Sequence, residues 1–314
     1  MGEAIITRRG GGKITIAGQE IITGILAGAV NKFDTVYADF LLSNDKLANP
    51  NALPSGTGKG VAFSPDGAYM SVAHYDSPYV TIYKRSGDTF TKLPNPSELP
   101  TGATYSSAYG VAFSPDNNYM SVAHDISPYV TIYKRSGDTF TKLANPSILP
   151  GSSGHGVAFS ADSNYLSVAN YNSPYLTIYK RSGDTFTKLA NPSILPTGHG
   201  WGVAFSADSN YLSVAYDASP YVTIYKRSGD TFTKLANPSI LPPNRGNEVA
   251  FSPDNNYLSV AHSTSPYITI YKREIISADI YPAFNSASTV LNGLGYAKLA
   301  GTTGQAIDMV SIFK

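Results

Sequence analysis

The stretch YKRSGDTFTKLANPSILP (Tyr133–Pro150) decides the fold, because it recurs letter for letter at Tyr179–Pro196 and at Tyr225–Pro242. A fourth copy begins at Tyr83 and differs at only two positions. Internal repeats of a fixed period indicate an architecture built from one repeated structural unit. Each copy is therefore expected to build the same piece of scaffold, and the residues between the copies are expected to carry what differs.

The motif Val-Ala-Phe-Ser sets the period of the repeat. It begins at five places, which are Val61, Val111, Val157, Val203 and Val249. After it come a turn rich in Pro, Asp, Asn and Gly, then Tyr-(Met/Leu)-Ser-Val-Ala, Ser-Pro-Tyr, Val-Thr-Ile-Tyr, Ser-Gly-Asp and Thr-Phe-Thr-Lys-Leu. Short β-prone segments between turn formers predict four strands per unit, which we call a to d in chain order.

Four short antiparallel strands repeated at about 46 residues are typical of a β-propeller. The segments GVAFSPDGAYMSVAH (Gly60–His74) and SPYVTIYKRSG (Ser77–Gly87) and their counterparts resemble the WD-repeat-like and YVTN-type propellers. The resemblance implies an all-β fold in which small sheets pack face to face around a central channel.

The number of blades depends on the degenerate ends of the chain. We predict one domain of seven blades over all 314 residues: a first blade at about 13–50, the five Val-Ala-Phe-Ser units, and a last blade at about 285–314 closed by a strand from 4–8. Residues 309–314 would be the third strand of that last blade, and 275–284 would supply the outer strand of the blade before it. The alternative is five or six blades with the ends forming a small separate domain.

Composition narrows the function classes. The net charge is +1 and only 14% of residues are charged, which argues against binding to nucleic acid or to an anionic membrane. Cysteine is absent, so disulfide and thiolate chemistry are excluded. The longest apolar run, Ile21–Val30, is too short to span a bilayer, and the start has no signal-peptide core. We expect synthesis in the bacterial cytoplasm without a signal peptide.

Differences between the copies concentrate in the connections between strands b and c and between strand d and the next strand a. In a four-stranded antiparallel blade these connections emerge on the same face. We take this variable face as the candidate ligand-binding surface, with these residues: Lys59, Tyr75, Tyr105, Tyr109, His155, Tyr171, His199, Trp201, Tyr216, Arg245 and Asn247. Tyr, Trp and Arg are the types that most often anchor interfaces, and loops on a rigid scaffold often carry function. Unrestrained drift of the loops is the alternative.

Other repeated polar residues have structural interpretations. His74, His124 and His262 share one position after strand b, where capping of a strand end is favoured over a metal site. The Asp residues of the a–b turns, such as Asp66, are expected to accept hydrogen bonds from the turn backbone. The Lys-Arg pairs, such as Lys84-Arg85, are expected to form a solvated edge that discourages pairing between sheets. We expect no catalytic residue, no metal and no cofactor.

The ends of the chain suggest a biological setting. MGEAIITRRGGG and Leu294–Phe313 resemble the terminal segments of phage and prophage virion proteins of Gram-positive bacteria. This resemblance implies a non-enzymatic propeller of a phage or phage-like particle that binds a host-surface glycan or protein, alone or as a homo-oligomer. A purely structural virion component, held by other virion proteins, is one alternative. A lactonase-like propeller enzyme is the second.

Overall fold

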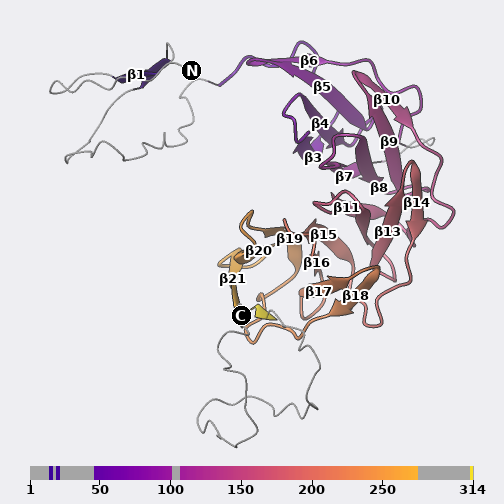
Figure 1. Cartoon of the computed structure of the whole chain (residues 1–314), viewed down its shortest axis with the longest axis vertical. Coiled ribbons are helices and arrows are strands. Elements are labelled where there is room, and N and C mark those ends of the chain that lie inside the picture. Colours follow the sequence, from indigo (N-terminus) through magenta and orange to yellow (C-terminus); the bar gives the residue numbers. More distant parts are fainter. Residues whose placement is uncertain (1–13, 17–18, 22–45, 101–106, 275–311, 314) are drawn as a thin grey trace, which may run out of the picture. The chain divides into compact units, whose positions relative to one another are not determined.

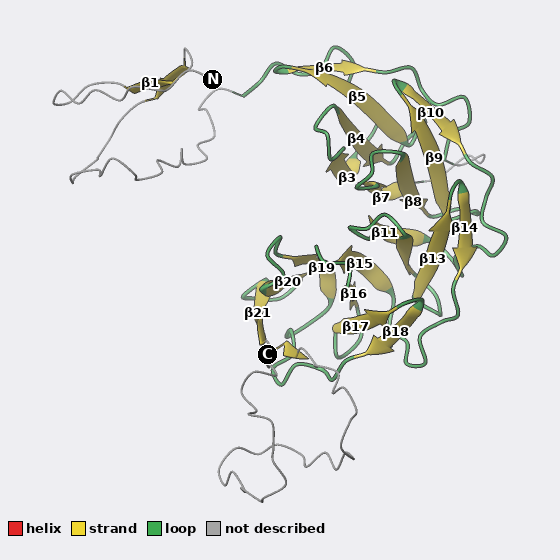
Figure 2. Ribbon diagram, in the orientation of Figure 1, coloured by secondary structure: helices red, strands yellow, loops and turns green. Residues whose placement is uncertain are grey.

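The structure is a computed structural model that describes residues 14–16, 19–21, 46–100, 107–274 and 312–313. The chain divides into two compact units, Met1–Leu47 and Ala48–Lys314. In the first unit, β1 (Ile14–Ile16) and β2 (Gln19–Ile21) form an antiparallel pair. Every regular element among the described residues is a strand (Figure 2).

The second unit contains five four-stranded sheets, which we number blades 1 to 5. Within each blade the strands follow in chain order from a to d, and the first strands β3, β7, β11, β15 and β19 lie against one another along the chain (Figure 1). Blade 1 is β3 (Gly58–Phe63), β4 (Tyr69–His74), β5 (Val80–Ser86) and β6 (Thr89–Lys92). Blade 2 is β7 (Ala108–Phe113), β8 (Tyr119–His124), β9 (Val130–Ser136) and β10 (Thr139–Lys142).

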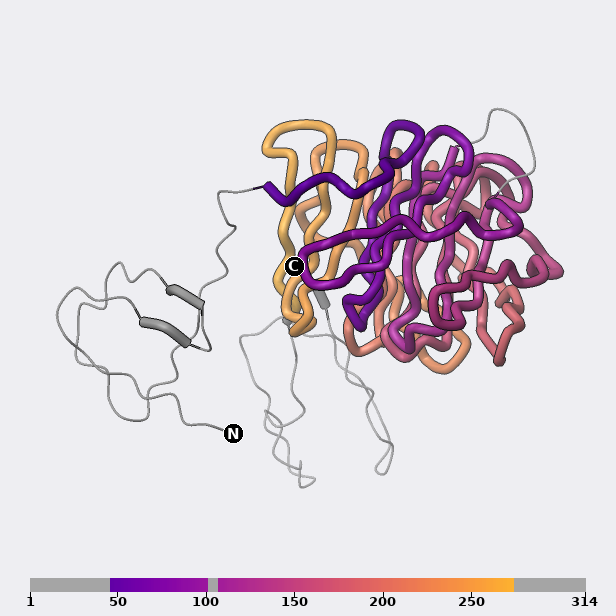
Figure 3. Tube along the Cα trace, turned by 90° about the horizontal axis from the view of Figure 1, so that it is seen from above, coloured from indigo at the N-terminus to yellow at the C-terminus, as the bar shows by residue number. Residues whose placement is uncertain are grey.

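The next two blades repeat this pattern. Blade 3 is β11 (Gly154–Phe159), β12 (Tyr165–Asn170), β13 (Leu176–Ser182) and β14 (Thr185–Lys188). Blade 4 is β15 (Gly200–Phe205), β16 (Tyr211–Tyr216), β17 (Val222–Ser228) and β18 (Thr231–Lys234). The strands predicted from the repeat are therefore confirmed in order and in pairing. Connections turn at the two ends of the blades, as a view along a perpendicular direction shows (Figure 3).

Blade 5 departs from the prediction. It consists of β19 (Gly246–Phe251), β20 (Tyr257–His262), β21 (Ile268–Glu274) and, as its fourth strand, β22 (Ile312–Phe313). The register pairs Arg273 with Phe313, which is the place that Phe232 takes opposite Arg227 in blade 4. The assignment of 309–314 to a seventh blade is thus wrong: the C-terminal strand completes the fifth.

The described residues form five blades, not the predicted seven. The segment 275–284, predicted as an outer strand, lies outside the described residues, as do 4–8 and most of 13–50. The fold class is confirmed, and the alternative of five blades is the one that these strands support.

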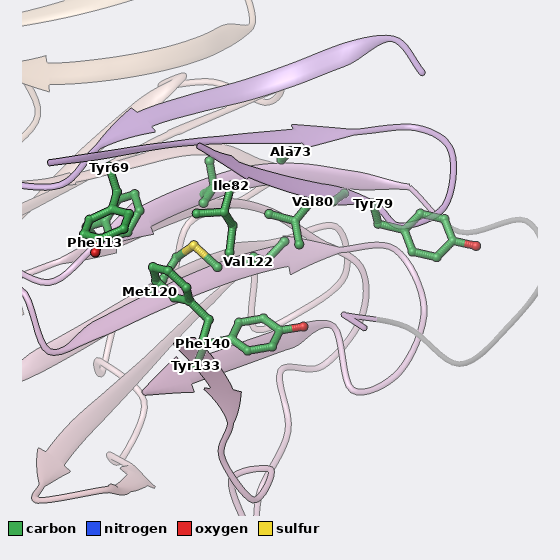
Figure 4. Close-up of a cluster of buried hydrophobic side chains, with 12 residues drawn as sticks. Tyr69, Ala73, Tyr79, Val80, Ile82, Phe113, Met120, Val122, Tyr133 and Phe140 are labelled. Carbon is green, nitrogen blue, oxygen red and sulfur yellow. The ribbon is translucent and has the colours of Figure 1, made fainter. Parts of the chain in front are cut away.

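Apolar side chains on facing blades form the core. Between blades 1 and 2, Val80 and Ile82 of β5 pack against Phe113 of β7 and Met120 of β8, all of them buried (Figure 4). The repeat places the same residue types at every such contact, so each junction buries an equivalent set. Burial of these side chains is the main favourable contribution to folding.

The Lys-Arg pairs join blades instead of forming a free edge, which corrects the prediction. Lys134 lies 2.7 Å from Asp184 of the next blade, and Arg135 lies 2.8 Å from Asp66 of the blade before it. The Arg135 guanidinium also lies over the Tyr69 ring at 4.3 Å. The verbatim repeat is therefore explained by its contacts: it carries both halves of an interblade junction. The turn prediction for Asp66 is confirmed, since its carboxylate accepts the Ala68 N–H at 3.0 Å.

Candidate functional site at the inner strands

Each inner strand contains a bulge at the same place. In blade 2, Ala108 pairs with His124 and Gly110 pairs with Ala123. Tyr109 lies between them and has no partner residue on β8. A bulge inserts one residue, bends the strand and re-aims a side chain, and it is common next to active sites. The bulges of the five blades contain the five residues that precede each Val-Ala-Phe-Ser motif by two places: Lys59, Tyr109, His155, Trp201 and Asn247. The bulge thus presents a position at which all five copies of the repeat differ.

Glycine after the bulge lets neighbouring inner strands approach closely. A Cβ at Gly110 would lie 2.6 Å from the His155 carbonyl oxygen, and one at Gly156 would lie 2.7 Å from the Trp201 carbonyl oxygen. Any larger residue would push the strands apart. This close approach brings the bulge side chains of consecutive blades into direct contact.

The bulge side chains form a continuous row of rings. The Tyr109 ring lies edge-on to His155 at 4.8 Å, and His155 stacks on Trp201 at 4.3 Å with 17° between the ring planes. Tyr75 precedes this row, 6.4 Å from Tyr109. Edge-on and stacked pairs of this kind stabilise by about 0.5–1.5 kcal/mol beyond burial of their area. The structure thus brings four of the predicted residues, Tyr75, Tyr109, His155 and Trp201, into one row; their role in ligand binding stays a prediction.

A cation lies at each end of the row. Lys59 places its ammonium 4.8 Å from the centre of the Tyr75 ring, and Arg245 places its guanidinium 3.9 Å from Trp201. Arg245 also donates from Nε to Oδ1 of Asn247 at 2.9 Å. Cations over ring faces are attracted by the ring quadrupole and remain able to bind an anion.

Tyr171 and His199 form a second layer behind the row. Their ring centres are 3.8 Å apart, and Tyr171 also contacts His155 at 5.7 Å. His199 Nδ1 lies 3.2 Å from Asp217, whose other oxygen accepts the His199 backbone N–H at 2.8 Å. These contacts hold the second layer in place against the row.

A cavity of about 280 Å³ opens along the inner strands. The polar and aromatic residues of its wall are Lys59, Tyr109, His155 and Glu248, and its floor is glycine and valine of the same strands. Trp201 stacks on the lining residue His155, and the Trp201 Nε1–H is buried without a hydrogen-bond partner among the described residues. A buried donor without a partner is uncommon, and a bound polar group would satisfy it.

The pKa values of three cavity groups differ from their ordinary values. Burial lowers the pKa of His155, against a smaller opposing effect of its bond to the Gly200 carbonyl. That bond, 3.2 Å from Nδ1 to the carbonyl oxygen, requires a proton on Nδ1 and leaves the lone pair on Nε2. Burial raises the pKa of Tyr109 to about 12, so its hydroxyl stays a donor. Burial by the surrounding protein raises the pKa of Glu248, although the residue remains exposed to solvent.

Glu248 is the site residue that the sequence prediction missed. It stands where the four other repeats have glycine before the valine, and a Cβ at Gly202 would meet its carboxylate and backbone. The letters Gly-Asn-Glu-Val-Ala against Gly-Trp-Gly-Val-Ala contained that signal, because a charged residue replaced a glycine that packing otherwise requires.

One predicted residue does not join the site, and another lies outside the described residues. Tyr216 is fully buried and shares a hydrogen bond of 2.8 Å with the Thr223 hydroxyl, so it cannot contact a ligand on this face. The prediction failed because Tyr216 occupies the strand-end position of His124, which the fold buries. Tyr105 lies outside the described residues.

The repeated histidines have the structural role that was predicted. Nε2 of His74, His124 and His262 lies 2.9, 3.0 and 3.0 Å from a threonine hydroxyl on the neighbouring strand of the same blade. Among the described residues no group of three His, Asp or Glu side chains is placed to hold a metal. No helix in that part of the chain is long and apolar enough to cross a membrane.

Several solved structures share this fold. A putative 6-phosphogluconolactonase from Bacteroides uniformis has a TM-score of 0.54 and 16% identity, covering 68% of this chain and 66% of that one. The periplasmic gluconolactonase of Pseudomonas aeruginosa has a TM-score of 0.55 and 18% identity, covering 69% and 66%. A Lactobacillus plantarum protein has a TM-score of 0.58 and 17% identity, covering 69% and 67%. The chain thus spans about two thirds of each, and the likeness shows a shared fold.

No family model and no curated protein matches the sequence. The similar structures give no support to the expected phage function, and two of these three bear lactonase names. The expectation of a non-enzymatic virion propeller is corrected on that ground, and the lactonase alternative is the better supported one. The expected absence of a metal and a cofactor, and the expected localisation, stay predictions.

Proposed function

We propose that the protein is a lactonase-like propeller enzyme that opens a sugar lactone in the inner-strand cavity. The observation that carries the proposal is His155, a neutral imidazole on the cavity wall whose Nδ1–H is fixed on the Gly200 carbonyl. Fold likeness to proteins named gluconolactonases supports the reaction class and the substrate class.

His155 and Glu248 divide the proton transfers between them. Nε2 of His155 takes a proton from a water molecule, whose oxygen attacks the lactone carbonyl carbon. The bond from that carbon to the ring oxygen then breaks, and the leaving oxygen takes a proton to become a hydroxyl. Glu248 is the donor for that step, because its pKa is raised while that of His155 is lowered. The raised pKa of Glu248 favours the protonated acid and the lowered pKa of His155 favours the neutral base, which are the forms that the two steps require.

Tyr109 and the flanking cations would hold the substrate. The Tyr109 hydroxyl, protonated at neutral pH, can donate to the carbonyl oxygen as charge develops on it. The rings of the row can pack on the apolar face of a sugar. Lys59, on the cavity wall, can bind an anionic substituent such as a phosphate.

Lactone opening followed as acid release tests the proposal. His155→Asn keeps a donor for Gly200 but removes the base, so the rate should fall about 100-fold or more, in the range that a general base contributes. His199→Asn is the matched control, because His199 is not part of the cavity wall, and it should retain most activity. A wild-type rate equal to spontaneous hydrolysis, or equal loss in both variants, would overturn the proposal.

Lys59 allows a test of the substrate's charge. Lys59→Met should raise KM for a phosphorylated sugar lactone about tenfold and leave KM for the unphosphorylated lactone nearly unchanged, since only an anionic group uses the ammonium. Steady-state kinetics with both lactones measures the difference. Equal effects on the two would remove Lys59 from substrate binding.

A further inference from the structure

Each described junction joins two faces. We call the face of the earlier blade in the chain the outgoing face and the face of the next blade the incoming face. At the junction of blades 2 and 3, the outgoing face supplies Tyr119, Lys134 and Asp116, and the incoming face supplies Arg181 and Asp184. Tyr119 donates to Asp184 at 2.6 Å, Lys134 lies 2.7 Å from Asp184, and Arg181 lies 2.6 Å from Asp116. Apolar side chains of both faces are buried beneath these pairs.

No blade formed by the described residues lies against the incoming face of blade 1. Among the described residues, the side chains of Arg85 and Asp88, which correspond to Arg181 and Asp184, have no ionic partner. Val61 is 64% exposed and Phe63 is 54% exposed, whereas the same two positions in blade 2 are 8% exposed. This is the surface that blades 2 to 4 bury against the preceding blade.

The outgoing face of blade 5 is open in the same way. In the part of the chain that the structure describes, Asp254, Tyr257 and Lys272 lack the partners that their counterparts have in blades 1 to 3. Ile270 is 62% exposed, whereas Ile82 at its position in blade 1 is 3% exposed. A hollow of about 410 Å³ on this face is lined mainly by apolar side chains, including Phe251, Tyr257 and Ile270.

We infer that these two faces bind each other between two copies of the chain, with blade 5 of one copy packed on blade 1 of the next. The pairs would be Asp254 with Arg85, and Tyr257 and Lys272 with Asp88. Phe63 would enter beside Ile270, as Phe113 lies beside Ile82 within the chain. This inference is independent of the proposed activity.

The sequence and the charges favour a second copy as the occupant. Lys-Arg-Ser-Gly-Asp occurs only four times, at Lys84, Lys134, Lys180 and Lys226, so the chain holds no further copy to complete blade 5. Among the described residues, the copy at Lys84 is the one whose Arg85 and Asp88 have no ionic partner. The first and last inner strands, β3 and β19, contact β7 and β15 respectively and do not pack on each other (Figure 1). An interface between two different faces is heterologous, and it produces a closed ring or a filament.

Two blocking variants of the full-length chain test the arrangement. Ile270→Asp closes the outgoing face and Phe63→Asp closes the incoming face; both side chains are mostly exposed, so the blades should still fold. Sedimentation velocity should show wild-type species of two or more copies that grow with protein concentration. Each variant alone should be a monomer. Their equimolar mixture should form a one-to-one dimer and nothing larger, because only one pair of intact faces remains.

A third variant serves as the control, and two results would overturn the inference. Ile240→Asp changes an even more exposed isoleucine outside both faces and should assemble as the wild type does. A wild-type monomer at every concentration would overturn the inference, and it would indicate that the faces are closed within one chain. A mixture that stays monomeric while the wild type assembles would also overturn it, since assembly would then use other surfaces.

Discussion

At the scale of single residues, one inserted position per blade creates the candidate site. The bulge in each inner strand presents Lys59, Tyr109, His155, Trp201 or Asn247, and in blades 1 to 4 the glycine after it lets the next strand approach. Bulges re-aim side chains without altering the ladder on either side. Variation at this position therefore changes the site while leaving the scaffold intact.

Two glycines of neighbouring inner strands, one crowded by the next strand and one not, test whether the close approach requires glycine. Gly110→Ala should lower the free energy of unfolding by about 1–3 kcal/mol, because the new Cβ would lie 2.6 Å from the His155 carbonyl oxygen. Gly58→Ala meets only a Val72 methyl at 3.6 Å and should be nearly neutral. Urea unfolding measures both, and equal effects would refute the packing argument.

Comparison of the repeat copies identified residues that the structure brings together, but it did not distinguish exposed variable positions from buried ones. The row from Tyr75 to Trp201 was predicted because variable letters in aligned copies stand out. Tyr216 was wrongly included. It differs from the residues at its position in the other copies, but it is buried and, as they do, it shares a hydrogen bond with a threonine hydroxyl. Glu248 was missed because its role depends on the space left by glycine in the neighbouring blade, which no single repeat reveals.

At the scale of the element, the end of each second strand is fixed by a buried polar pair. In blade 2, the Thr131 hydroxyl donates to the Pro100 carbonyl at 2.8 Å, so His124 Nε2–H donates to Thr131 at 3.0 Å. Burial lowers the pKa of His124 to about 4 and keeps it neutral. The pair therefore connects the preceding d–a connection to both central strands.

Removal of the threonine hydroxyl should leave buried groups without partners. Thr131→Val should destabilise the protein by about 1–3 kcal/mol, the usual effect of a buried donor or acceptor without a partner. Thr139→Val, at an exposed position of β10, is the control. Thermal unfolding should separate the two variants by several degrees, and indistinguishable midpoints would contradict this account of the strand end.

The ion pairs between blades predict that acid lowers the stability of the folded protein. Partial burial raises the pKa of Asp66, but bonds from Ser64, Ala68 and Arg135 outweigh it and lower the value to about 2. Because the folded pKa is below the ordinary 3.8, the stabilisation is complete above that pH and is lost as the pH falls towards 2. Arg135→Gln should therefore lose less stability than the wild type between pH 5 and pH 2. Urea midpoints at both values measure this, and equal losses would count against the pair.

At the scale of the whole molecule, the described chain is five blades held by one repeated junction. The fold class followed from the repeat, because a period of four short strands leaves few architectures. The number of blades did not follow, because it depended on degenerate segments. The strand pairing of β22 with β21 is a contact distant in sequence, and no local pattern distinguishes the third strand of one blade from the fourth strand of another.

The pH dependence of lactone opening by the wild-type protein tests the central claim most directly. We predict a rate well above spontaneous hydrolysis at pH 7 that persists below pH 6.5, because burial lowers the pKa of His155, and then falls as His155 takes up a proton. A rate that never exceeds spontaneous hydrolysis between pH 4 and pH 8, with glucono-lactone or its 6-phosphate, would contradict the claim.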